Sequence, residues 1–285
     1  MQLGYNTNGF AHHGLLPAIQ VLHEIGYRCV AITLDHAALN PFAPGCEAIA
    51  AGLRAQLDAW QMTNVVETGA RYLLDPHRKH HPTLVSQHAA DRQRRLEFLQ
   101  RAVDVAAILQ SECVSIWSGA VMEPAADDER TWEQLTSSLS QLLRYADERG
   151  VVIAFEPEPD MFIDTMAAYE QLVQRLAHPS LKLTLDLGHL HCQGEVPIGP
   201  QIARWGDAIA NIHIEDMRAG VHEHLMFGEG EMDFAEIGEA LRRIRYEGPV
   251  NVELSRHSHM APLAAQQAYD FLTSRWTTDD TTHVS

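Results

Sequence analysis

The stretch Val151-Val-Ile-Ala-Phe-Glu156 is a short apolar run that ends on a carboxylate. Three later strand-like runs also end on a residue type that binds metal ions: Leu181-Lys-Leu-Thr-Leu-Asp186, Ala210-Asn-Ile-His213 and Pro249-Val-Asn-Val-Glu253. In a parallel barrel the carboxyl ends of all strands open onto one face, so the four residues are predicted to share one site. Any one of them alone also fits a helix cap or a salt bridge. Three like charges, however, rarely gather at buried strand ends without a cation.

The whole chain alternates short runs rich in Val, Ile and Leu with longer segments of helical period. The predicted strands are 2–7, 29–35, 63–68, 113–118, 151–156, 181–187, 209–214 and 249–254. The predicted helices are about 14–26, 46–60, 86–111, 128–149, 164–177, 199–207, 234–246 and 262–274. Strict β-α alternation predicts a parallel α/β sheet, and eight repeats predict closure into a single (β/α)₈ TIM barrel. We expect this domain to span 1–275, with 276–285 as a polar C-terminal tail.

Composition excludes several classes of function. A formal net charge of −17 over 285 residues argues against a general affinity for nucleic acid, which needs a basic footprint. The N-terminus lacks the layout of a signal peptide, and no stretch reaches the 18 apolar residues of a membrane span. We therefore expect a cytoplasmic protein without membrane contact. The four cysteines, Cys29, Cys46, Cys113 and Cys192, show no CxxC spacing and are predicted to be buried reduced thiols.

The segment 69–85 after the third predicted strand is longer than a minimal barrel connection. It carries a basic cluster: Arg71, His77, Arg78, Lys79, His80 and His81. Such a loop at the active face fits a lid or substrate clamp for an anionic or polyhydroxylated substrate. A solvated charged loop fits the sequence equally well.

The four strand-end residues indicate a particular chemistry. Four protein ligands leave about two positions of an octahedron for a hydroxyl and a carbonyl of a substrate. A chelated α-hydroxy carbonyl has an acidified C–H, since the metal stabilises the enediolate that forms on deprotonation. Glu156 and Glu253 are the predicted acid–base pair, because their strands lie on different sides of the barrel mouth. Glu67, at the end of the third predicted strand, is expected to face the same rim.

Several motifs resemble the xylose isomerase-like TIM barrels, a superfamily of sugar-phosphate isomerases and epimerases, ketose 3-epimerases, inosose dehydratase and endonuclease IV. They are Phe155-Glu156-Pro157, Thr184-Leu-Asp186-Leu-Gly-His189, Asn211-Ile-His213-Ile-Glu-Asp216 and Val252-Glu253. The resemblance spans nearly the whole chain and is strongest from residue 151 onward. It implies that Glu156, Asp186, His213 and Glu253 bind one divalent ion, Mn²⁺ in preference to Mg²⁺, Co²⁺ or Zn²⁺. It also implies that the two glutamates transfer the proton.

The resemblance further implies substrate contacts. His189 matches a histidine that contacts a substrate oxygen in that family, although it also suits the structural role of orienting Asp186. Arg218, five residues after His213, lies near the position at which the ketose 3-epimerases have a substrate arginine, although the spacing is not identical. Trp117 fits a stacking wall for a sugar ring or ordinary packing, and Glu158 fits a hydrogen-bond acceptor or a solvated rim residue. His224 completes the predicted substrate-binding set.

A second likeness concerns the stretch His222-Glu-His224-Leu-Met-Phe-Gly228-Glu-Gly230. It resembles an Asp-x-His-x-x-x-Gly-Glu-Gly stretch of endonuclease IV, in which the first and third residues bind an additional zinc. That nuclease also needs histidines after its third and fourth strands, where this chain has Glu67-Thr68-Gly69 and Trp117-Ser118-Gly119. A three-zinc phosphodiesterase is therefore the weaker interpretation.

We expect a metal-dependent isomerase or epimerase of a sugar-like small molecule. A metal-dependent lyase or dehydratase acting on a keto-sugar or keto-cyclitol is the main alternative, since both begin with removal of a proton next to a carbonyl. A barrel that keeps the metal for structure alone is a third class. The sequence leaves open the substrate and its phosphorylation, and also the oligomeric state, homo-oligomers included.

Overall fold

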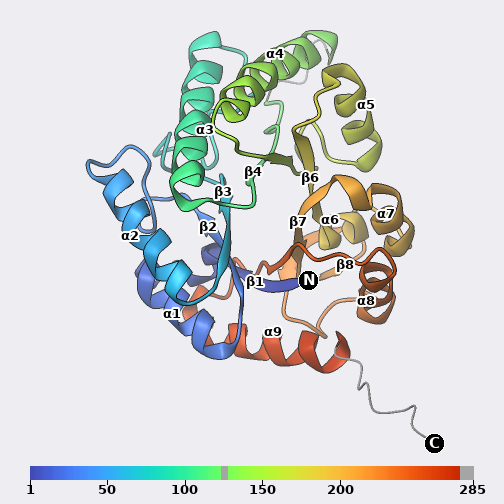
Figure 1. Cartoon of the computed structure of the whole chain (residues 1–285). Coiled ribbons are helices and arrows are strands. Elements are labelled where there is room, and N and C mark those ends of the chain that lie inside the picture. The colour runs from blue at the N-terminus through green and yellow to red at the C-terminus, as the bar shows by residue number, and fades with distance from the viewer. Residues whose placement is uncertain (123–127, 277–285) are drawn as a thin grey trace, which may run out of the picture.

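The computed structural model describes residues 1–122 and 128–276. Within them, parallel strands close into one barrel in the order β1-β10-β7-β6-β5-β4-β3-β2 (Figure 1). The barrel strands are β1 Gln2–Asn6, β2 Cys29–Thr33, β3 Thr63–Glu67, β4 Val114–Ile116, β5 Ile153–Phe155, β6 Leu181–Asp186, β7 Ile209–Ile214 and β10 Pro249–Val252. The predicted (β/α)₈ barrel is confirmed, with each strand in its predicted place and its ends within two residues of the predicted ones.

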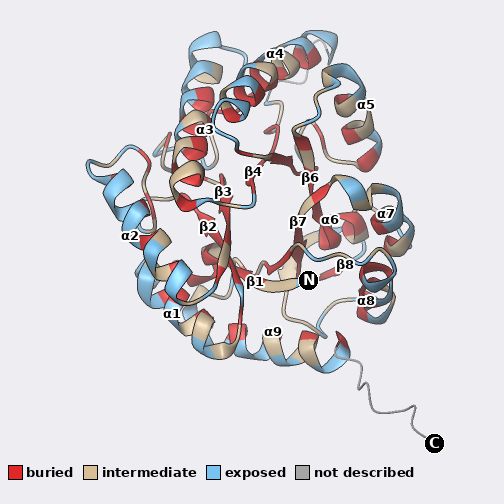
Figure 2. Ribbon diagram, viewed as in Figure 1, coloured by how far each residue is buried: buried red, intermediate tan, exposed pale blue. Residues whose placement is uncertain are grey.

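Helices surround the barrel and bury the faces that they turn toward it, which are red in Figure 2. They are α1 Leu15–Ile25, α2 Cys46–Ala59, α3 Ala89–Leu109, α4 Asp128–Asp147, α5 Met166–Leu176, α7 Ile198–Trp205, α8 Phe234–Arg243 and α9 Ala261–Trp276. The strands between them are almost wholly buried, as expected for a parallel sheet that is covered on its outer face. All four cysteines are free and buried, as predicted.

Two features at the carboxyl end of the barrel were not predicted. A short helix, α6 Leu187–Cys192, follows β6 directly, and an antiparallel hairpin of β8 Asp216–Arg218 and β9 Val221–Leu225 follows β7. Short 3₁₀ turns occur at Thr7–Phe10, Gly206–Ala208 and Ser258–Met260. Helix α6 and the hairpin lie next to each other and build one side of the barrel mouth.

The carboxyl end of the chain departs from prediction by one residue. Trp276, which we assigned to the polar tail, is the buried last residue of α9, and its indole nitrogen donates to Phe234 O at 2.9 Å. The rest of the predicted tail, 277–285, lies outside the described residues, as does 123–127. Among the described residues, no helix combines the length and apolar composition needed to cross a bilayer.

Candidate metal centre and active site

A cavity of about 640 Å³ opens at the carboxyl ends of the barrel strands. This is the end at which enzymes of this architecture carry their active sites. Its floor is formed by polar side chains that point inward from the strands, including Thr33, Glu67 and His213. The cavity is therefore the place to examine the predicted residues.

The structure brings the four predicted metal ligands together. Glu156 follows β5, Asp186 ends β6, His213 lies in β7 and Glu253 follows β10. Ligand atoms from all four lie within 4.8 Å of one another, although the four residues come from strands spread over half the ring. Parallel register produces this convergence, since Asp186 pairs directly with His213 across β6 and β7.

His213 is the centre of the cluster. Its Nδ1 lies 3.1 Å from Glu156 Oε1, 3.1 Å from Glu253 Oε2 and 3.8 Å from Asp186 Oδ2. Its Nε2 lies 2.9 Å from Glu67 Oε1, which also accepts a hydrogen bond from Asn211 Nδ2 at 3.2 Å. Glu67 therefore fixes the ring, and Nδ1 faces the three carboxylates. A carboxylate behind a histidine is the usual support of a metal-binding imidazole.

An unpartnered oxygen shows that the cluster fits a cation. Asp186 Oδ1 accepts the backbone N–H of His189 at 2.8 Å, whereas the buried Oδ2 has no hydrogen-bond partner among the described residues. Glu253 Oε1 accepts from Asn8 Nδ2 at 2.6 Å, which leaves Oε2 toward the centre. Burying three carboxylates with an unpaired oxygen is costly unless a positive charge is present. A divalent ion coordinated by oxygen and one imidazole nitrogen fits this donor set.

The protonation equilibria in this centre are strongly shifted. Burial raises the pKa of Glu156 well above its usual value. Burial also raises the pKa of Glu253, but the charge of His213 outweighs this effect and leaves the pKa lowered. Burial lowers the pKa of His213, whereas Glu67, Glu156 and Glu253 together raise it well above its usual value. The centre is thus a coupled set of buried charges, a pattern that is typical of functional sites.

Four of the five predicted substrate residues line the same cavity: Trp117, Glu158, His189 and His224. Trp117 follows β4 as a buried wall, with the guanidinium of Arg95 over its ring at 4.4 Å and the His80 ring edge-on at 5.5 Å. Burial and the charge of Glu253 raise the pKa of Glu158 to about 7. A wall of this kind and a carboxyl group beside the cluster suit a polyhydroxylated ligand.

Arg218 is not brought to this cavity, and we correct its prediction. It lies exposed on β8, where its Nη2 donates to Glu229 O at 3.1 Å and its Nη1 lies 4.0 Å from Glu223. The unpredicted β8–β9 hairpin explains the error, because it turns the chain away from the cavity directly after Asp216. Among the described residues that line the cavity, Arg256 brings an arginine side chain to the rim from the segment after β10.

The basic segment after β3 divides into two parts. Gly69, Arg71, Lys79 and His80 line the cavity, with Arg71 held by Asn8 O at 2.9 Å. At its tip, Arg78 and His77 are exposed and close a turn on Asp75, whose Oδ1 accepts both backbone N–H groups. The segment therefore has a part that lines the cavity and an exposed tip, and its role as a lid or substrate clamp stays a prediction.

The Gly228-Glu-Gly230 stretch supports the hairpin rather than the cluster. Asp216 Oδ2 accepts the backbone N–H groups of Gly228 at 2.8 Å and Gly230 at 2.9 Å. A Cβ on Gly230 would lie 2.2 Å from Asp216 Oδ1, so no larger residue fits there. The motif residues therefore hold the loop after β9 against β8.

Sequence reasoning missed several contributors to the site. Asn8 reaches Glu253 from the turn after β1, Arg95 supports Trp117 from α3, and Glu215 lies buried beside His224. Asn8 and Arg95 sit outside any motif, and nothing in their spacing indicates the site. Glu215 stands within the quoted Asn211–Asp216 motif, and its place directly after β7 was the available signal.

The chain is similar in sequence to a family of TIM barrels and to several characterised enzymes. A family model described as xylose isomerase-like TIM barrel matches residues 19–275. L-ribulose-5-phosphate 3-epimerase UlaE of Shigella flexneri serotype 5b is 27% identical over 216 residues, 74% of each protein. Inosose dehydratase of Lacticaseibacillus casei is 31% identical over 144 residues, 45% of this chain and 47% of that protein. An uncharacterized protein of Methanocaldococcus jannaschii is 26% identical over 167 residues, 57% of each protein. The last two matches thus span only about half of those relatives.

Solved structures show the same fold. The crystal structure of a D-allulose 3-epimerase from Methylomonas sp. in complex with D-allulose matches with a TM-score of 0.76, at 20% sequence identity. The match covers 96% of this chain and 97% of that chain. An L-ribulose 3-epimerase structure matches with a TM-score of 0.77 at 16% identity, over 96% of this chain and 94% of that chain. At these identities the likeness shows the architecture, and the chemistry must be argued from the residues.

Proposed function

The chain belongs to the xylose isomerase-like TIM barrel family, and from that premise we propose that it is a metal-dependent epimerase or isomerase of a sugar-like α-hydroxy carbonyl compound. One observation carries the proposal. Glu156 and Glu253 come from non-adjacent strands, yet both reach His213 Nδ1 at 3.1 Å, beside the unpartnered Oδ2 of Asp186. Two carboxylates thus lie around one candidate cation site beside a cavity of about 640 Å³, and this arrangement supports the proposal.

Each residue has a role in this proposal. Glu156, Asp186, His213 and Glu253 would hold one divalent ion, Mn²⁺ in preference to Mg²⁺, Co²⁺ or Zn²⁺, which would supply Lewis acidity for negative charge on the substrate oxygens. The two glutamates exchange the proton of the substrate carbon: one carboxylate removes it and the other returns a proton to the opposite side. Return from the opposite side inverts that carbon, which is an epimerisation.

The remaining cavity residues would position the substrate. Trp117 offers an apolar wall to the face of a sugar ring, held in place by the buried Arg95. Glu158 and His189 would bind substrate hydroxyls, and Arg71 and Lys79 of the basic segment would close over them. Water is excluded when this segment covers the cavity, which strengthens every charge interaction beneath it.

The test is deuterium exchange from solvent into a panel of ketoses, 3-keto sugars and inososes, followed by mass spectrometry. We expect metal-dependent exchange of one C–H in at least one compound, and a loss of 10²-fold or more, on the order of a general-base contribution, in Glu156→Gln and Glu253→Gln. Glu112→Gln is the matched control, since Glu112 lies exposed at the opposite end of β4. No exchange in any compound, or equal exchange in all variants, would show that proton abstraction is the wrong chemistry.

A dehydratase is the second candidate, supported by the similarity to an inosose dehydratase. Both reactions begin with removal of the same kind of proton and differ in whether a hydroxyl then leaves. The same experiment separates them, because dehydration gives a product that has lost one water molecule, whereas epimerisation gives a product that differs in mass from the substrate only by the incorporated deuterium.

A further inference from the structure

The layer of the barrel interior directly beneath the candidate metal centre is polar. It contains Asn211 of β7 and Asn251 of β10, both fully buried, together with the buried Ser115 of β4 and Thr184 of β6. The interior of such barrels is usually filled by Val, Ile and Leu. Buried polar groups cost stability unless they are hydrogen-bonded, so this layer needs a reason beyond packing.

A row of hydrogen bonds crosses this layer and ends at the centre. Asn251 Nδ2 donates to Asn211 Oδ1 at 2.9 Å, and Asn211 Nδ2 donates to Glu67 Oε1 at 3.2 Å. The same Glu67 oxygen lies 2.9 Å from His213 Nε2. Strand β3, which carries Glu67, lies opposite β7 in the ring. The row therefore spans the barrel interior and joins β10, β7 and β3.

The orientation of the Asn211 amide decides which group reaches Glu67. A carboxylate oxygen only accepts hydrogen bonds, so it needs the NH₂ end of the amide. If the Asn211 amide turned by half a rotation, its oxygen would face Glu67 and its NH₂ would face that of Asn251. Since Asn251 Nδ2 donates to Asn211 Oδ1, Asn251 fixes which end of Asn211 reaches the carboxylate.

Glu67 passes this orientation on to His213. Its Oε1 accepts from Nδ2 of Asn211 and from Nε2 of His213, so a neutral imidazole keeps its proton on Nε2. Nδ1 then presents its lone pair to the three carboxylates of the centre, which is where a metal ligand must face. With one donor instead of two, the Glu67 carboxylate has more orientations open to it, and the ring that it supports turns with it.

Strand β1 leaves room for the row. Gly4 pairs with Asn251 in the parallel register of β1 and β10. A Cβ on Gly4 would lie 2.0 Å from Asn251 Oδ1, so a larger residue there would displace the amide. That oxygen is buried and has no hydrogen-bond partner among the described residues. Asn251 is therefore held by shape on the side of β1 and by its bond to Asn211 on the side of β7.

We propose that Asn211 and Asn251 are positioning residues of the candidate metal centre, which act on His213 through Glu67. The inference rests on the proposed function, because it assigns a task to residues beneath the ion that this function requires. Neither asparagine is among the described residues that line the cavity. Their effect on the centre must therefore pass through the Glu67 carboxylate rather than through contact with a substrate.

Metal affinity tests the proposal without a substrate. Isothermal titration of the metal-free full chain with Mn²⁺ should show binding about 10-fold weaker in Asn211→Ala, the lower end of the range for an outer partner of a ligating histidine. Asn251→Ala should weaken binding by a smaller factor, because it acts one bond further away. The matched control is Ser115→Ala, which removes a hydroxyl that accepts from Thr184 in the same layer, beside Glu67 in the register. This control should destabilise the fold and keep the wild-type Mn²⁺ affinity.

A double-mutant cycle separates positioning from a general loosening of the barrel. If Asn211 acts through Glu67, Asn211→Ala causes no further loss of Mn²⁺ affinity once Glu67→Ala is present, whereas the effects of independent changes add. Visible absorption of bound Co²⁺ reports the geometry of the ligands. We expect the two single variants to change this spectrum in the same way.

The outcomes separate this proposal from the proposed function. Wild-type Mn²⁺ affinity in both asparagine variants, or additive losses in the cycle, overturns the positioning role and leaves the metal centre in place. A wild-type protein that binds no divalent ion overturns the proposed function and the positioning role together. Thermal melts of the metal-free variants identify misfolding. If Asn211→Ala does not fold, Asn251→Ala decides, since it leaves Asn211 and Glu67 in place.

Discussion

Glu67 is a buried carboxylate that supports the candidate metal centre without belonging to it. Its Oε1 lies 2.9 Å from His213 Nε2 and holds the ring so that Nδ1 faces the three carboxylates. We predict that Glu67→Ala weakens Mn²⁺ binding about 10–100-fold, the range found when an outer partner of a ligating histidine is removed. Isothermal titration of the metal-free protein measures this affinity.

Two comparisons make that prediction specific. Glu67→Gln keeps an oxygen acceptor for His213 and should lose less affinity than Glu67→Ala. The exposed Glu112→Gln at the opposite end of the barrel should bind Mn²⁺ as the wild type does. Unchanged affinity in Glu67→Ala would mean that His213 does not need this hydrogen bond for its orientation.

His80, in the basic segment after β3, predicts a pH dependence of stability. Its Nδ1 contacts Gly69 O, and burial lowers the pKa of His80 from 6.5 to about 4. Between these values the unfolded chain binds a proton that the folded chain does not, so the free energy of unfolding falls as the pH drops through 6.5 toward 4. Above pH 6.5 this contribution is constant.

The size of the effect is bounded at about 1.4 kcal/mol per pH unit from one histidine. The free energy of unfolding is measured with urea between pH 4 and 8 in the presence of a chelator. Its increase with pH should be smaller for His80→Gln than for the wild type. His77→Gln, an exposed histidine of the same segment, should keep the wild-type slope. Equal slopes in the wild type and His80→Gln would assign the acid sensitivity to other groups.

At the scale of elements, α6 depends on a glycine. A Cβ on Gly188 would lie 1.9 Å from Glu215 Oε1 and 2.8 Å from Met217 Cε. We predict that Gly188→Ala lowers the free energy of unfolding by about 1–3 kcal/mol, the usual cost of overpacking a filled interior. Denaturant titration measures it, with Gly52→Ala as the matched control.

Gly52 lies within α2 and has no atom within 4 Å of the place of a Cβ. Alanine there should therefore stabilise the protein by about 0.5–1 kcal/mol, because it restricts the unfolded chain and favours the helix. Destabilisation by both substitutions to the same extent would show that crowding against Glu215 is not the cause.

The elements that the sequence did not predict have physical reasons. Helix α6 is six residues long and continues the apolar run of β6 without a break, so no change of period marks it. The hairpin strands β8 and β9 are short and partly exposed, which gives them no hydrophobic alternation to detect. The barrel strands were predictable because most of them are buried, apolar and rich in β-branched residues, and because they alternate with helices.

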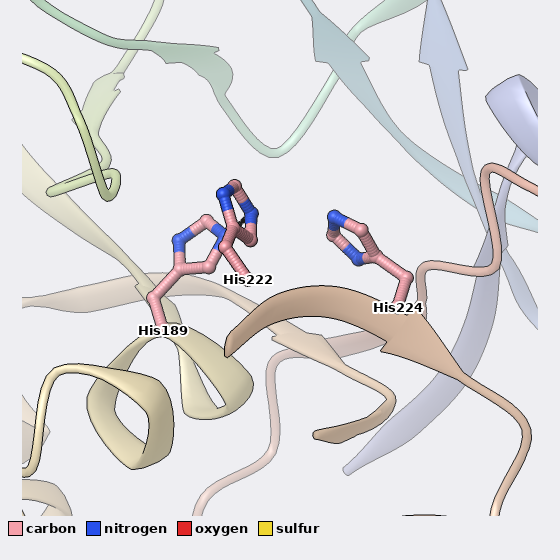
Figure 3. Close-up of side chains that lie close together, drawn as sticks. All are labelled: His189, His222 and His224. Carbon is pink, nitrogen blue, oxygen red and sulfur yellow. Dashed lines mark hydrogen bonds between the residues drawn. The ribbon is translucent and has the colours of Figure 1, made fainter. Parts of the chain in front are cut away.

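The same difference between barrel strands and short surface elements decides which parts of the candidate site could be predicted. Strand-end residues such as Asp186 and His213 could be placed from spacing, because parallel strands meet at one face. Contacts made by α6 and the hairpin could not be placed, since they depend on tertiary packing between elements that the sequence does not mark. His222 therefore stood out in the sequence as part of a motif, whereas its contact with His189 at 3.1 Å was not predicted (Figure 3).

At the scale of the whole molecule, the first and last strands close the ring. Strand β1 pairs with β10 in the register Gln2 to Pro249 through Tyr5 to Val252. Helix α9 packs beside α1 across this seam, where Tyr27 donates to Ala265 O at 2.9 Å. Neither half of the chain has a closed core of its own, so we infer that residues 1–276 form one domain.

One domain predicts one unfolding transition, and the proposed metal centre provides its sharpest test, because its ligands would join β5, β6, β7 and β10. Far-ultraviolet circular dichroism follows all elements, and tryptophans from Trp60 to Trp276 report on different sectors of the ring. We expect thermal unfolding to give the same midpoint temperature in both signals. At a free Mn²⁺ concentration of about 100 times Kd, metal binding should raise the free energy of unfolding by about 2.7 kcal/mol. The midpoint temperatures from both signals should rise accordingly. Asp186→Asn should remove this shift. A metal ion that binds to four strands of a closed ring should stabilise the whole ring at once. Two different midpoints, or a metal-induced shift in only one signal, would therefore mean that the chain unfolds as independent units.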